Sequence, residues 1–352
     1  IKLHKKNHGK LEIVSKVSLK NKNDLSLAYT PGVAGVCEEI ARDKNLAREY
    51  TIKKNTVAIV SDGSAILGLG NLGPLAAIPV MEGKASIFKE FGGVDAFPIC
   101  LDTQDTEEII KAVKQIAPVF GGINLEDISA PRCFEIEERL RKELDIPVMH
   151  DDQWGAATVI LSALINALKV RKLDKKEAKV VLSGVGAAGV ATGRLLHEYG
   201  ITNTIFCDSK GIINSKRENL TKEKIELLEK STIEEKDGSL EEAIKGMNIF
   251  IGLSKPNIIS SEMVKSMAKD PIIFALANPT PEILPEKAHK AGAFIVATGR
   301  SDYPNQINNS LVFPGAFKAM LDKKIPQFEN KIFTKIAESL AKVVKNPNPD
   351  KI

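Results

Sequence analysis

A glycine-rich turn constrains the fold of this chain more than any other feature of its sequence. The turn at 184–189 has the spacing G-x-G-x-x-G, follows the apolar run 180–183 directly and opens a helix-period segment over 187–199. A second apolar run, 204–207, then ends on Asp208. A strand, a glycine turn, a helix and a second strand with an acidic end form the βαβ unit that binds dinucleotides. The predicted dinucleotide-binding residues are Gly184, Gly186, Ala187, Ala188, Gly189 and Asp208.

The same glycine spacing occurs once more, at Gly68, Gly70 and Gly73, in a less suitable context. The segment 62–67 separates these glycines from the preceding apolar run, and Asp95 precedes a predicted strand instead of ending one. We interpret this copy as a tight loop that lets the backbone pass close to a ligand or a neighbouring element.

Asp208 also bears on the choice of coenzyme. A carboxylate at this position accepts hydrogen bonds from the ribose 2′-hydroxyl of NAD and repels the additional phosphate of NADP. Ser209 and Lys210 follow at once and are able to hold a phosphate. The sequence therefore favours NAD and leaves NADP open.

Short apolar runs alternate with helix-period segments up to about residue 299, as in strands joined by crossover helices. The chain has 352 residues, and because single cores stop growing at about 250–300 residues, we expect two domains. We predict an α/β fold, with a Rossmann-type domain and a second α/β domain that contains a parallel sheet. The predicted strands are 56–60, 96–101, 122–125, 146–149, 180–183, 204–207, 249–252, 272–275 and 293–297, and the predicted helices are 74–91, 105–117, 132–144, 156–170 and 187–199.

Three further segments bear on the organisation of the chain. The charged stretch 171–179 follows a long apolar helix and is the strongest linker candidate. The residues from Pro314 onward look helical and amphipathic, and we expect them to pack back on one of the two halves. Because the first residue is Ile1 and not Met, we expect a few residues upstream.

Composition and charge argue against several classes of protein. The 49 basic and 45 acidic residues leave a net charge of +4, and the lysines are scattered, so we expect no nucleic-acid surface. No apolar run approaches the roughly 20 residues of a membrane span, and the start of the chain does not resemble a signal peptide. The 4 cysteines are too far apart for a zinc knuckle or a redox pair, which favours a reducing cytoplasm.

Two acidic pairs follow predicted strands at the point where each strand ends. Glu126 and Asp127 follow one strand, and Asp151 and Asp152 follow another. Carboxylates brought together at this edge of a parallel sheet would repel each other unless a cation joined them, so the sequence predicts a site for Mg²⁺ or Mn²⁺. As an alternative, Asp127 and Asp152 fit the N-caps of the following helices. His150 is more typical of a packed residue than of a ligand.

Four other residues stand out by their surroundings. Lys84 lies in an otherwise apolar helical stretch, where burial near a cation would lower its pKa towards a value useful for proton abstraction. Tyr29 is held by a prolyl turn, and Asn278 and Asn308, with Asn309 directly after it, are uncharged donors after apolar strands or loops. The alternative interpretations are a solvated helix lysine, a turn aromatic and turn-forming asparagines.

Taken together, these residues make the chain similar to the malic enzymes, in particular the short bacterial type. The matching segments span nearly the whole chain in the family's order. They are LAYTPGVAG at 27–35, VSDGSAILGLGNLGPLAAIPVMEGK at 60–84, GINLEDI at 122–128, HDDQWG at 150–155, SGVGAAG at 183–189, ANPT at 277–280 and NNSLVFPG at 308–315. The resemblance implies oxidative decarboxylation of malate to pyruvate and CO₂ with NAD or NADP and a divalent metal.

The resemblance also implies roles for individual residues. Tyr29 would be the general acid, Lys84 the general base and Asp151 the residue that holds Lys84. Asn278 and Asn308 would contact the substrate, and Asn278 would also contact the coenzyme. The implied metal ligands are Glu126, Asp127 and Asp152, and the implied cofactor residues are Gly184, Gly186, Ala187, Ala188, Gly189 and Asp208.

A division of the chain is implied as well. Residues 1–155 would form the substrate and metal domain, with 308–352 packing back on it, and 156–307 would form the dinucleotide-binding domain. The family also implies a homodimer, in which the segment carrying Tyr29 reaches the neighbouring site. Malate would be the small-molecule partner, and the length of the chain leads us to expect no phosphotransacetylase-like region after the malic part.

Two positions depart from the pattern of many relatives. Trp154 stands in the place of a His, and Ala65 stands where the larger animal enzymes carry an Arg that pairs with a substrate carboxylate. The asparagines, the metal and, as a further candidate, Ser64 would then hold that carboxylate. Two other functions remain as alternatives. An amino-acid dehydrogenase would leave the acidic pairs unexplained, and a non-catalytic NAD-binding sensor predicts gaps among the catalytic residues that this chain does not have.

Overall fold

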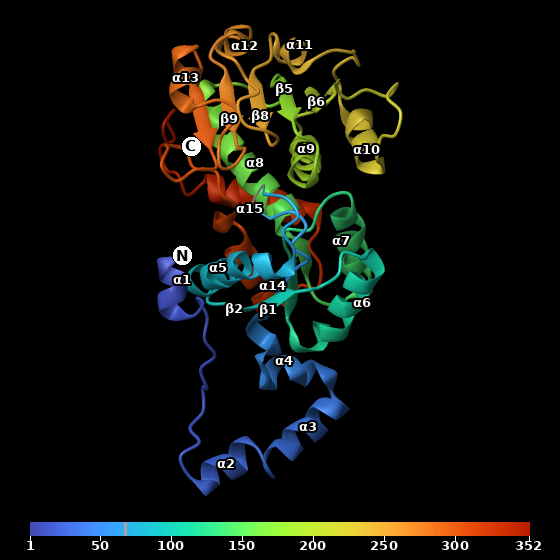
Figure 1. Ribbon diagram of the computed structural model, residues 1–352, viewed down its shortest axis with the longest axis vertical. Helices are drawn as coiled ribbons and strands as arrows, with labels where there is room; N and C mark the ends of the chain where they lie inside the picture. Colours follow the sequence, from blue (N-terminus) through green and yellow to red (C-terminus); the bar gives the residue numbers. More distant parts are fainter. Residues whose placement is uncertain (67–68) are drawn as a thin grey trace.

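The computed structural model describes residues 1–66 and 69–352, and it contains two largely parallel sheets stacked along the long axis of the molecule (Figure 1). The α/β class predicted from the sequence is confirmed. The first glycine motif is described only in part, because Gly68 lies outside the described residues.

The first sheet has the strand order β2-β1-β3-β4, with all neighbours parallel. Its elements are β1 (Thr56–Ser61), α5 (Pro74–Gly92), β2 (Asp95–Cys100), α6 (Thr106–Ile116), β3 (Gly122–Leu125), α7 (Arg132–Glu143) and β4 (Val148–His150). Val57 and Ile59 of β1 pack in one cluster with α5, whereas Ala58 and Val60 pack with α6 and α7. Because helices cover both faces, these strands read in the sequence as continuous apolar runs.

The second sheet has the order β10-β9-β8-β5-β6-β7 and is parallel except for the short pair β6 and β7. Its strands are β5 (Val180–Ser183), β6 (Thr204–Asp208), β7 (Gly211–Ile212), β8 (Ile249–Gly252), β9 (Ile272–Ala275) and β10 (Ile295–Thr298). Its helices are α9 (Ala187–Tyr199), α10 (Lys222–Lys230), α11 (Leu240–Ile244), α12 (Ser261–Lys265) and α13 (Pro285–Lys290). β5 lies between β6 and β8, so the glycine turn that follows β5 opens where the strand order reverses.

The helix α8 (Asp151–Arg171) joins the two sheets and is buried over most of its length. The predicted helix 156–170 starts too late, because the apolar pattern begins only there, whereas the helix begins directly after β4. Asp151 and Asp152 therefore lie in its first turn, where negative charge is favourable. By length and composition α8 could cross a membrane, but 83% of its most apolar window is buried inside the protein, as in a core helix.

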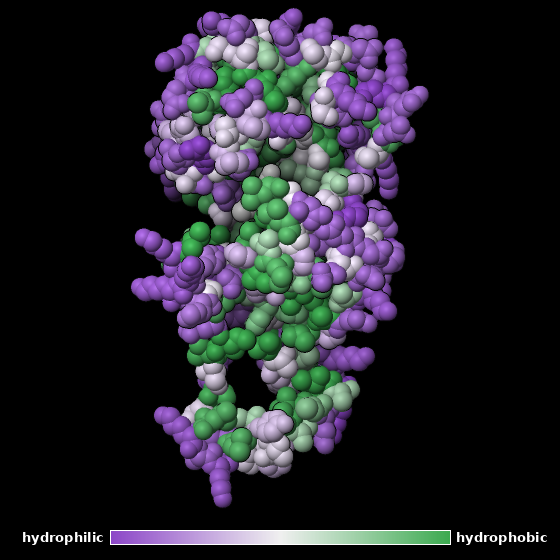
Figure 2. All heavy atoms as spheres, viewed as in Figure 1, coloured by the Kyte–Doolittle hydropathy of each residue, from purple (hydrophilic) through white to green (hydrophobic). Residues whose placement is uncertain are grey.

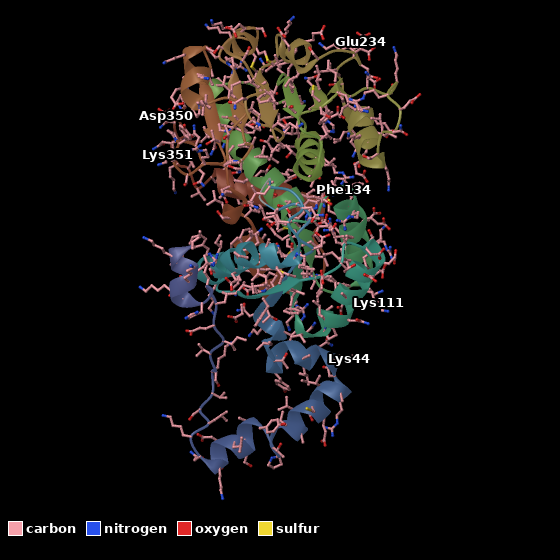
Figure 3. The ribbon with its side chains drawn as sticks, viewed as in Figure 1. Lys44, Lys111, Phe134, Glu234, Asp350 and Lys351 are labelled. Carbon is pink, nitrogen blue, oxygen red and sulfur yellow. The ribbon has the colours of Figure 1, made fainter. Side chains whose placement is uncertain are left out.

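The N-terminal segment forms an arm with few contacts to the rest of the chain. It contains α1 (Lys2–Asn7), α2 (Lys22–Ala28), α3 (Val33–Arg42) and α4 (Ala47–Tyr50), none of which has a buried residue. α1 lies beside α5, while α2 and α3 extend away from the first sheet, and Lys44 marks the return of the arm (Figures 1 and 3). Many apolar side chains of this arm are exposed, and Figure 2 shows them as green patches at its end.

The C-terminal segment touches both halves of the molecule. Phe313, at the start of α14 (Phe313–Lys323), packs against Phe88 of α5 with 4.7 Å between ring centroids. The helix α15 (Asn330–Ala341) packs against α8 and α9, and its Phe333 stacks on Trp154 at 4.8 Å. The chain ends beside the second sheet, where Figure 3 labels Asp350 and Lys351.

Candidate active site

The carboxyl ends of the two sheets line one cleft of about 1010 Å³. The first sheet contributes α5, the residues after β3 and the first turns of α8, and the second sheet contributes α9 and the loops after β8, β9 and β10. Since ligands bind at the carboxyl edge of parallel sheets, this cleft is the candidate active site.

Three carboxylates meet on the first-sheet wall of the cleft. Glu126, Asp127 and Asp152 each offer an oxygen, and these oxygens lie within 4.8 Å of one another. The Asp127 amide donates to Asp152 Oδ2 over 2.8 Å, and His150 Nε2 lies 3.1 Å from the same oxygen. Asp127 has a left-handed backbone with φ 52°, a conformation that Asp adopts more readily than most residues. These contacts tie the turn after β3 to the start of α8.

This donor set fits a hard divalent cation, because all three side chains offer carboxylate oxygens. Burial raises the pKa of Glu126 well above its usual range, Lys84 opposes that shift, and the neighbouring Asp residues add to it. A cation bound here would offset the cost of three neighbouring negative charges. The capping alternative for Asp127 and Asp152 is wrong, since the N-caps of α7 and α8 are Pro131 and His150.

Lys84 is buried beside this cluster. Its Nζ donates to Asp151 Oδ2 over 2.5 Å, contacts Glu126 and lies 4.5 Å from the ring centroid of Phe313. The alternative of a solvated helix lysine is therefore wrong. Burial alone lowers the pKa of Lys84, but the surrounding carboxylates, led by Asp151 and Glu126, raise it above its usual value. The predicted lowering refers to Lys84 beside a bound cation, whose positive charge would oppose this effect of the carboxylates.

Asp151 contacts Lys84 and has no exposed surface. Asn309 Nδ2 donates to Asp151 Oδ2 over 2.5 Å, so two side chains from distant segments hold this carboxylate. Gly155 makes room for it, because a Cβ at that position would lie 1.8 Å from Asp151 Oδ1. The sequence indicated Asn309 only as an uncharged donor beside Asn308 and gave it no role in the site.

The glycine turn lies on the opposite wall. Gly184 has φ 102°, and a Cβ on Gly189 would lie 2.0 Å from Gly184 O, so both positions require glycine. The space around Gly186 is open, which suits the close approach of a pyrophosphate to the N-terminus of α9. Ala188 lines the cleft, and Ala187 opens the helix.

Both residues that were predicted to contact the substrate, Asn278 and Asn308, line the cleft. Asn278 lies after β9, where its amide group fills the space beside Gly299. Asn308 lies after β10, and its Oδ1 accepts from the Ser310 amide over 2.9 Å. Because Oδ1 accepts this bond, Nδ2 is the atom of the Asn308 side chain that is able to donate to a ligand in the cleft.

Asp208 ends β6 as predicted, but its carboxylate is bound by two cations. Arg217 donates to both of its oxygens, over 3.0 and 2.9 Å, and Lys224 Nζ lies 3.1 Å from Oδ2. Burial raises the pKa of Asp208, but these donors and the Lys210 amide outweigh burial and lower it. Because its charge is compensated, the argument that Asp208 favours NAD by repelling the phosphate of NADP does not hold in its simple form.

Tyr29 is not brought to this site within the chain. It lies on the arm, its side chain is 66% exposed, and it is absent from the described residues that line the cleft. A single chain thus brings Lys84 and the three carboxylates together and leaves Tyr29 away from them.

Comparisons with known proteins agree with this geometry. Residues 8–141 match the family model of the malic enzyme N-terminal domain, and residues 154–352 match that of the malic enzyme NAD binding domain. The chain is 53% identical to a bifunctional malic/malolactic enzyme of Bacillus subtilis, over 97% of this chain and 84% of that protein. It is 55% identical to an NAD-dependent malic enzyme of Geobacillus stearothermophilus, over 96% of this chain and 70% of the other.

The chain belongs to the malic enzyme family. The crystal structure of the malic enzyme from Pyrococcus horikoshii superimposes with a TM-score of 0.95 and 51% identity, over 98% of this chain and 82% of that one. Other relatives, at 45–47% identity, are named NADP-dependent malic enzymes. The predicted family, fold class and enzyme type are confirmed, and the match decides against an amino-acid dehydrogenase.

Glu282 is a buried residue that the sequence did not predict, because a single Glu after a proline-rich turn has no pattern that marks it as part of a site. Glu282 has no exposed surface, and its carboxylate accepts from the amides of Ser254, over 3.1 Å, and Ala277, over 3.0 Å. These two amides lie in the loops after β8 and β9, which line the cleft. Gly252 leaves the space that the carboxylate fills. Glu282 therefore holds both loops of the second-sheet wall.

We expect Glu282→Gln to lower the free energy of unfolding by about 1.5–3 kcal/mol, because one backbone amide loses a charged acceptor. The displaced loops should also raise the KM for the coenzyme more than the KM for malate. Denaturant unfolding and steady-state kinetics measure both effects, with exposed Glu286→Gln as the control. If the Glu282 variant behaves like the Glu286 variant, Glu282 does not hold these loops.

Proposed function

We propose that this chain oxidises malate with NAD or NADP and decarboxylates the product to pyruvate. The observation that carries the proposal is one cleft in which a buried lysine and three carboxylates face a dinucleotide-binding glycine turn. The non-catalytic alternative would not need this arrangement of buried charges, whose burial is costly.

We propose Glu126, Asp127 and Asp152 as the residues that hold a divalent cation, Mg²⁺ or Mn²⁺, supported by their three oxygens within 4.8 Å. When bound, such an ion supplies a Lewis acid that polarises the 2-hydroxyl of malate and later the ketone.

In the proposed mechanism, a bound cation would offset the carboxylates around Lys84 and favour its neutral amine. The neutral Nζ then accepts the proton of the malate 2-hydroxyl as the hydride leaves C2 for the nicotinamide. Asp151 and Asn309 fix the position of Lys84, which is supported by their shared hydrogen bonds at Asp151 Oδ2. Asn278 and Asn308 bind the substrate, and Asn278 also contacts the coenzyme. After loss of CO₂, the Tyr29 hydroxyl protonates C3 of enolpyruvate.

We further propose a homodimer in which Tyr29 acts at the site of the neighbouring subunit. The support is the arm, whose residues Leu25, Leu27, Tyr29 and Val33 are 38–71% exposed. Apolar side chains gathered on one protruding segment are typical of a surface that a partner covers. A second copy of the chain would bury them and bring Tyr29 to a cleft.

Three further proposals concern the division into domains, the compartment and the coenzyme. We propose residues 1–155 with 308–352 as the substrate and metal domain and 156–307 as the coenzyme domain, although α15 also packs against α9 of the latter. We propose a reducing cytoplasm as the compartment, since the cysteines are unpaired. We propose that NAD and NADP are both accepted, with the coenzyme at the glycine turn.

The direct test is an absorbance assay at the reduced-nicotinamide band with malate, either coenzyme and Mn²⁺, with and without a chelator. Metal-dependent formation of NADH or NADPH is expected. Binding of coenzyme with no turnover under any combination would favour the sensor alternative.

For the metal site, we expect Asp152→Asn to weaken Mn²⁺ binding, because the cation loses one of its anionic ligands. Titration of Mn²⁺ by calorimetry gives the affinity independently of turnover, and the assay should show a raised Mn²⁺ requirement. Exposed Asp174→Asn serves as the control. Unchanged Mn²⁺ affinity in Asp152→Asn would remove this residue from the ligand set.

For the base, we expect Lys84→Ala to slow malate oxidation by a factor on the order of 10²–10⁴. The variant should still decarboxylate added oxaloacetate with metal, since that step removes no hydroxyl proton. Lys89→Ala, on the same helix but exposed, is the control. Tyr29→Phe should slow both reactions and especially the ketonisation of enolpyruvate. The assignment is wrong if Lys84→Ala abolishes decarboxylation while Tyr29→Phe leaves ketonisation unchanged.

For the dimer, we expect a mixture of Lys84→Ala and Tyr29→Phe subunits to regain activity. In a mixed dimer with Tyr29 acting across the interface, one site has both residues intact, so random exchange should restore up to about a quarter of wild-type activity. If Tyr29 acts within its own chain, every site keeps one defect and mixing restores nothing. Light scattering of the wild-type protein measures the oligomeric state directly, and an active monomer would exclude the arrangement.

A further inference from the structure

Lys10 lines the cleft and has no part in the proposed mechanism. It follows α1 in the sequence and shares the cleft lining with Pro79, Gly83 and Lys84 of α5. Its Nζ donates to the Pro79 carbonyl over 2.7 Å, which uses one of the three donors of an ammonium group. The part of the chain that the structure describes gives Lys10 no second acceptor, so two donors remain for a ligand.

Two glycines allow Lys10 to lie against the face of α5 that lines the cleft. Gly9 has φ 107°, and a Cβ on this residue would lie 2.8 Å from Glu82 Oε1, so the segment that carries Lys10 approaches α5 closely. A Cβ on Gly83 would lie 3.2 Å from Lys10 Nζ. Gly83 thus leaves the space in which the ammonium group lies, directly before Lys84 in the sequence. Figure 1 shows α1 beside α5, in agreement with these contacts.

No ion pair with a described residue compensates the charge of Lys10. The described residues that line the cleft include two basic side chains, Lys10 and Lys84, and Lys84 forms ion pairs with two carboxylates. Glu82, although close by on α5, forms no ion pair with Lys10. Lys10 is thus the positive charge in the described lining of the cleft that is left for an anionic ligand.

Malate has a carboxylate at each end, and the two ends fall at different parts of the proposed site. C1 is bonded to the carbon that carries the hydroxyl group, so it lies with that hydroxyl at Lys84 and at the three carboxylates that would hold the cation. C4 lies at the far end of the molecule. An anion that loses water there needs a partner of opposite charge. Lys10, which lies against Gly83 beside the base but outside its ion pairs, meets this requirement.

Ser64, the further candidate for a substrate carboxylate, does not compete for this role. Its Oγ donates to Asp62 Oδ1 over 2.6 Å, and Ser64 is absent from the described residues that line the cleft. Asn278 and Asn308 line the cleft and are able to orient a carboxylate. An amide donor also binds uncharged oxygens, however, so these asparagines do not select for a negative charge.

We propose that Lys10 binds the C4 carboxylate of malate and of oxaloacetate, and that it thereby selects these dicarboxylates over 2-hydroxy acids that lack this group. The inference deepens the proposed function and rests on it, because it assigns a residue to one end of the proposed substrate.

The role of Lys10 ends when CO₂ is lost. As the C3–C4 bond breaks, its electron pair stays on the three-carbon product as an enolate, and C4 leaves as an uncharged molecule. Lys10 therefore has a carboxylate to bind in malate and oxaloacetate but none in pyruvate. An interaction made equally before and during the oxidation lowers KM without raising kcat. We therefore expect loss of Lys10 to weaken substrate binding and to leave the chemical steps nearly unchanged.

The experiment compares malate with lactate, which has the same hydroxyl and C1 carboxylate but no C4 carboxylate. Steady-state kinetics with coenzyme and Mn²⁺ give the KM for malate, and lactate serves as a competitive inhibitor. We expect Lys10→Gln to raise the KM for malate at least about tenfold, as expected for loss of a charged hydrogen bond, with kcat within about twofold. The inhibition constant of lactate should change by less than about twofold. Lys10→Arg, which keeps the charge, should retain most of the affinity for malate.

Added salt gives an independent measurement. Because salt screens an ion pair that solvent reaches, it should raise the KM for malate more in the wild-type protein than in Lys10→Gln. Lys6→Gln is the matched control, since it removes the same charge from an exposed position of α1. Melting temperatures show whether Lys10→Gln folds, and Lys10→Met gives the same comparison if it does not.

The outcomes separate this inference from the proposed function. If Lys10→Gln has the malate KM of the wild-type protein, the inference is wrong and the proposed function stands. Equal losses of malate and lactate binding would overturn it in favour of a structural role or a contact with C1. Absence of malate turnover in the wild-type protein would contradict the proposed function and this inference together.

Discussion

The ammonium group of Lys84, held between Asp151 and Glu126, is the interaction on which the arrangement of the first half depends. The three residues come from α5, α8 and the end of β3, so one buried cluster sets how these elements lie relative to one another. Burying any of these charges without the others would cost several kcal/mol. Asn309 extends the same constraint to the segment before α14, which is distant in the sequence.

The helix α8 transmits this constraint to the second half. Its first turn carries the acidic residues, and its apolar remainder belongs to a core cluster that continues into β5, β8 and α9. The second-sheet wall of the cleft also depends on a buried carboxylate, but its partners are backbone amides and not a lysine. There the buried carboxylate of Glu282 is held by backbone amides and stabilises two loops together. Buried carboxylates thus hold both walls of the cleft. On the first-sheet wall the ammonium group of Lys84 compensates their charge, and on the second-sheet wall backbone N–H groups compensate that of Glu282.

The two ends of the molecule differ from this rigid centre. The arm leaves apolar surface in solvent and carries Tyr29 away from the cleft, and these two observations support the proposed homodimer. At the other end, Arg217 and Lys224 both form ion pairs with Asp208, so these three side chains together have a net positive charge. The first end bears on the proposed completion of the site by a second subunit, and the second places positive charge at the end of β6.

The sequence by itself determined the α/β class, the glycine turn and the strand ends that carry the acidic residues, because these depend on local periodicity and on backbone conformations that only glycine adopts. Tertiary structure decided the rest. Lys84 acquires a raised pKa from carboxylates far away in the chain, and Asp208 loses its free acceptors to Arg217 and Lys224. Glu282 and Asn309 become site residues only through contacts between loops. Such electrostatic effects depend on distance and burial in space, and the spacing of residues along the chain does not specify either.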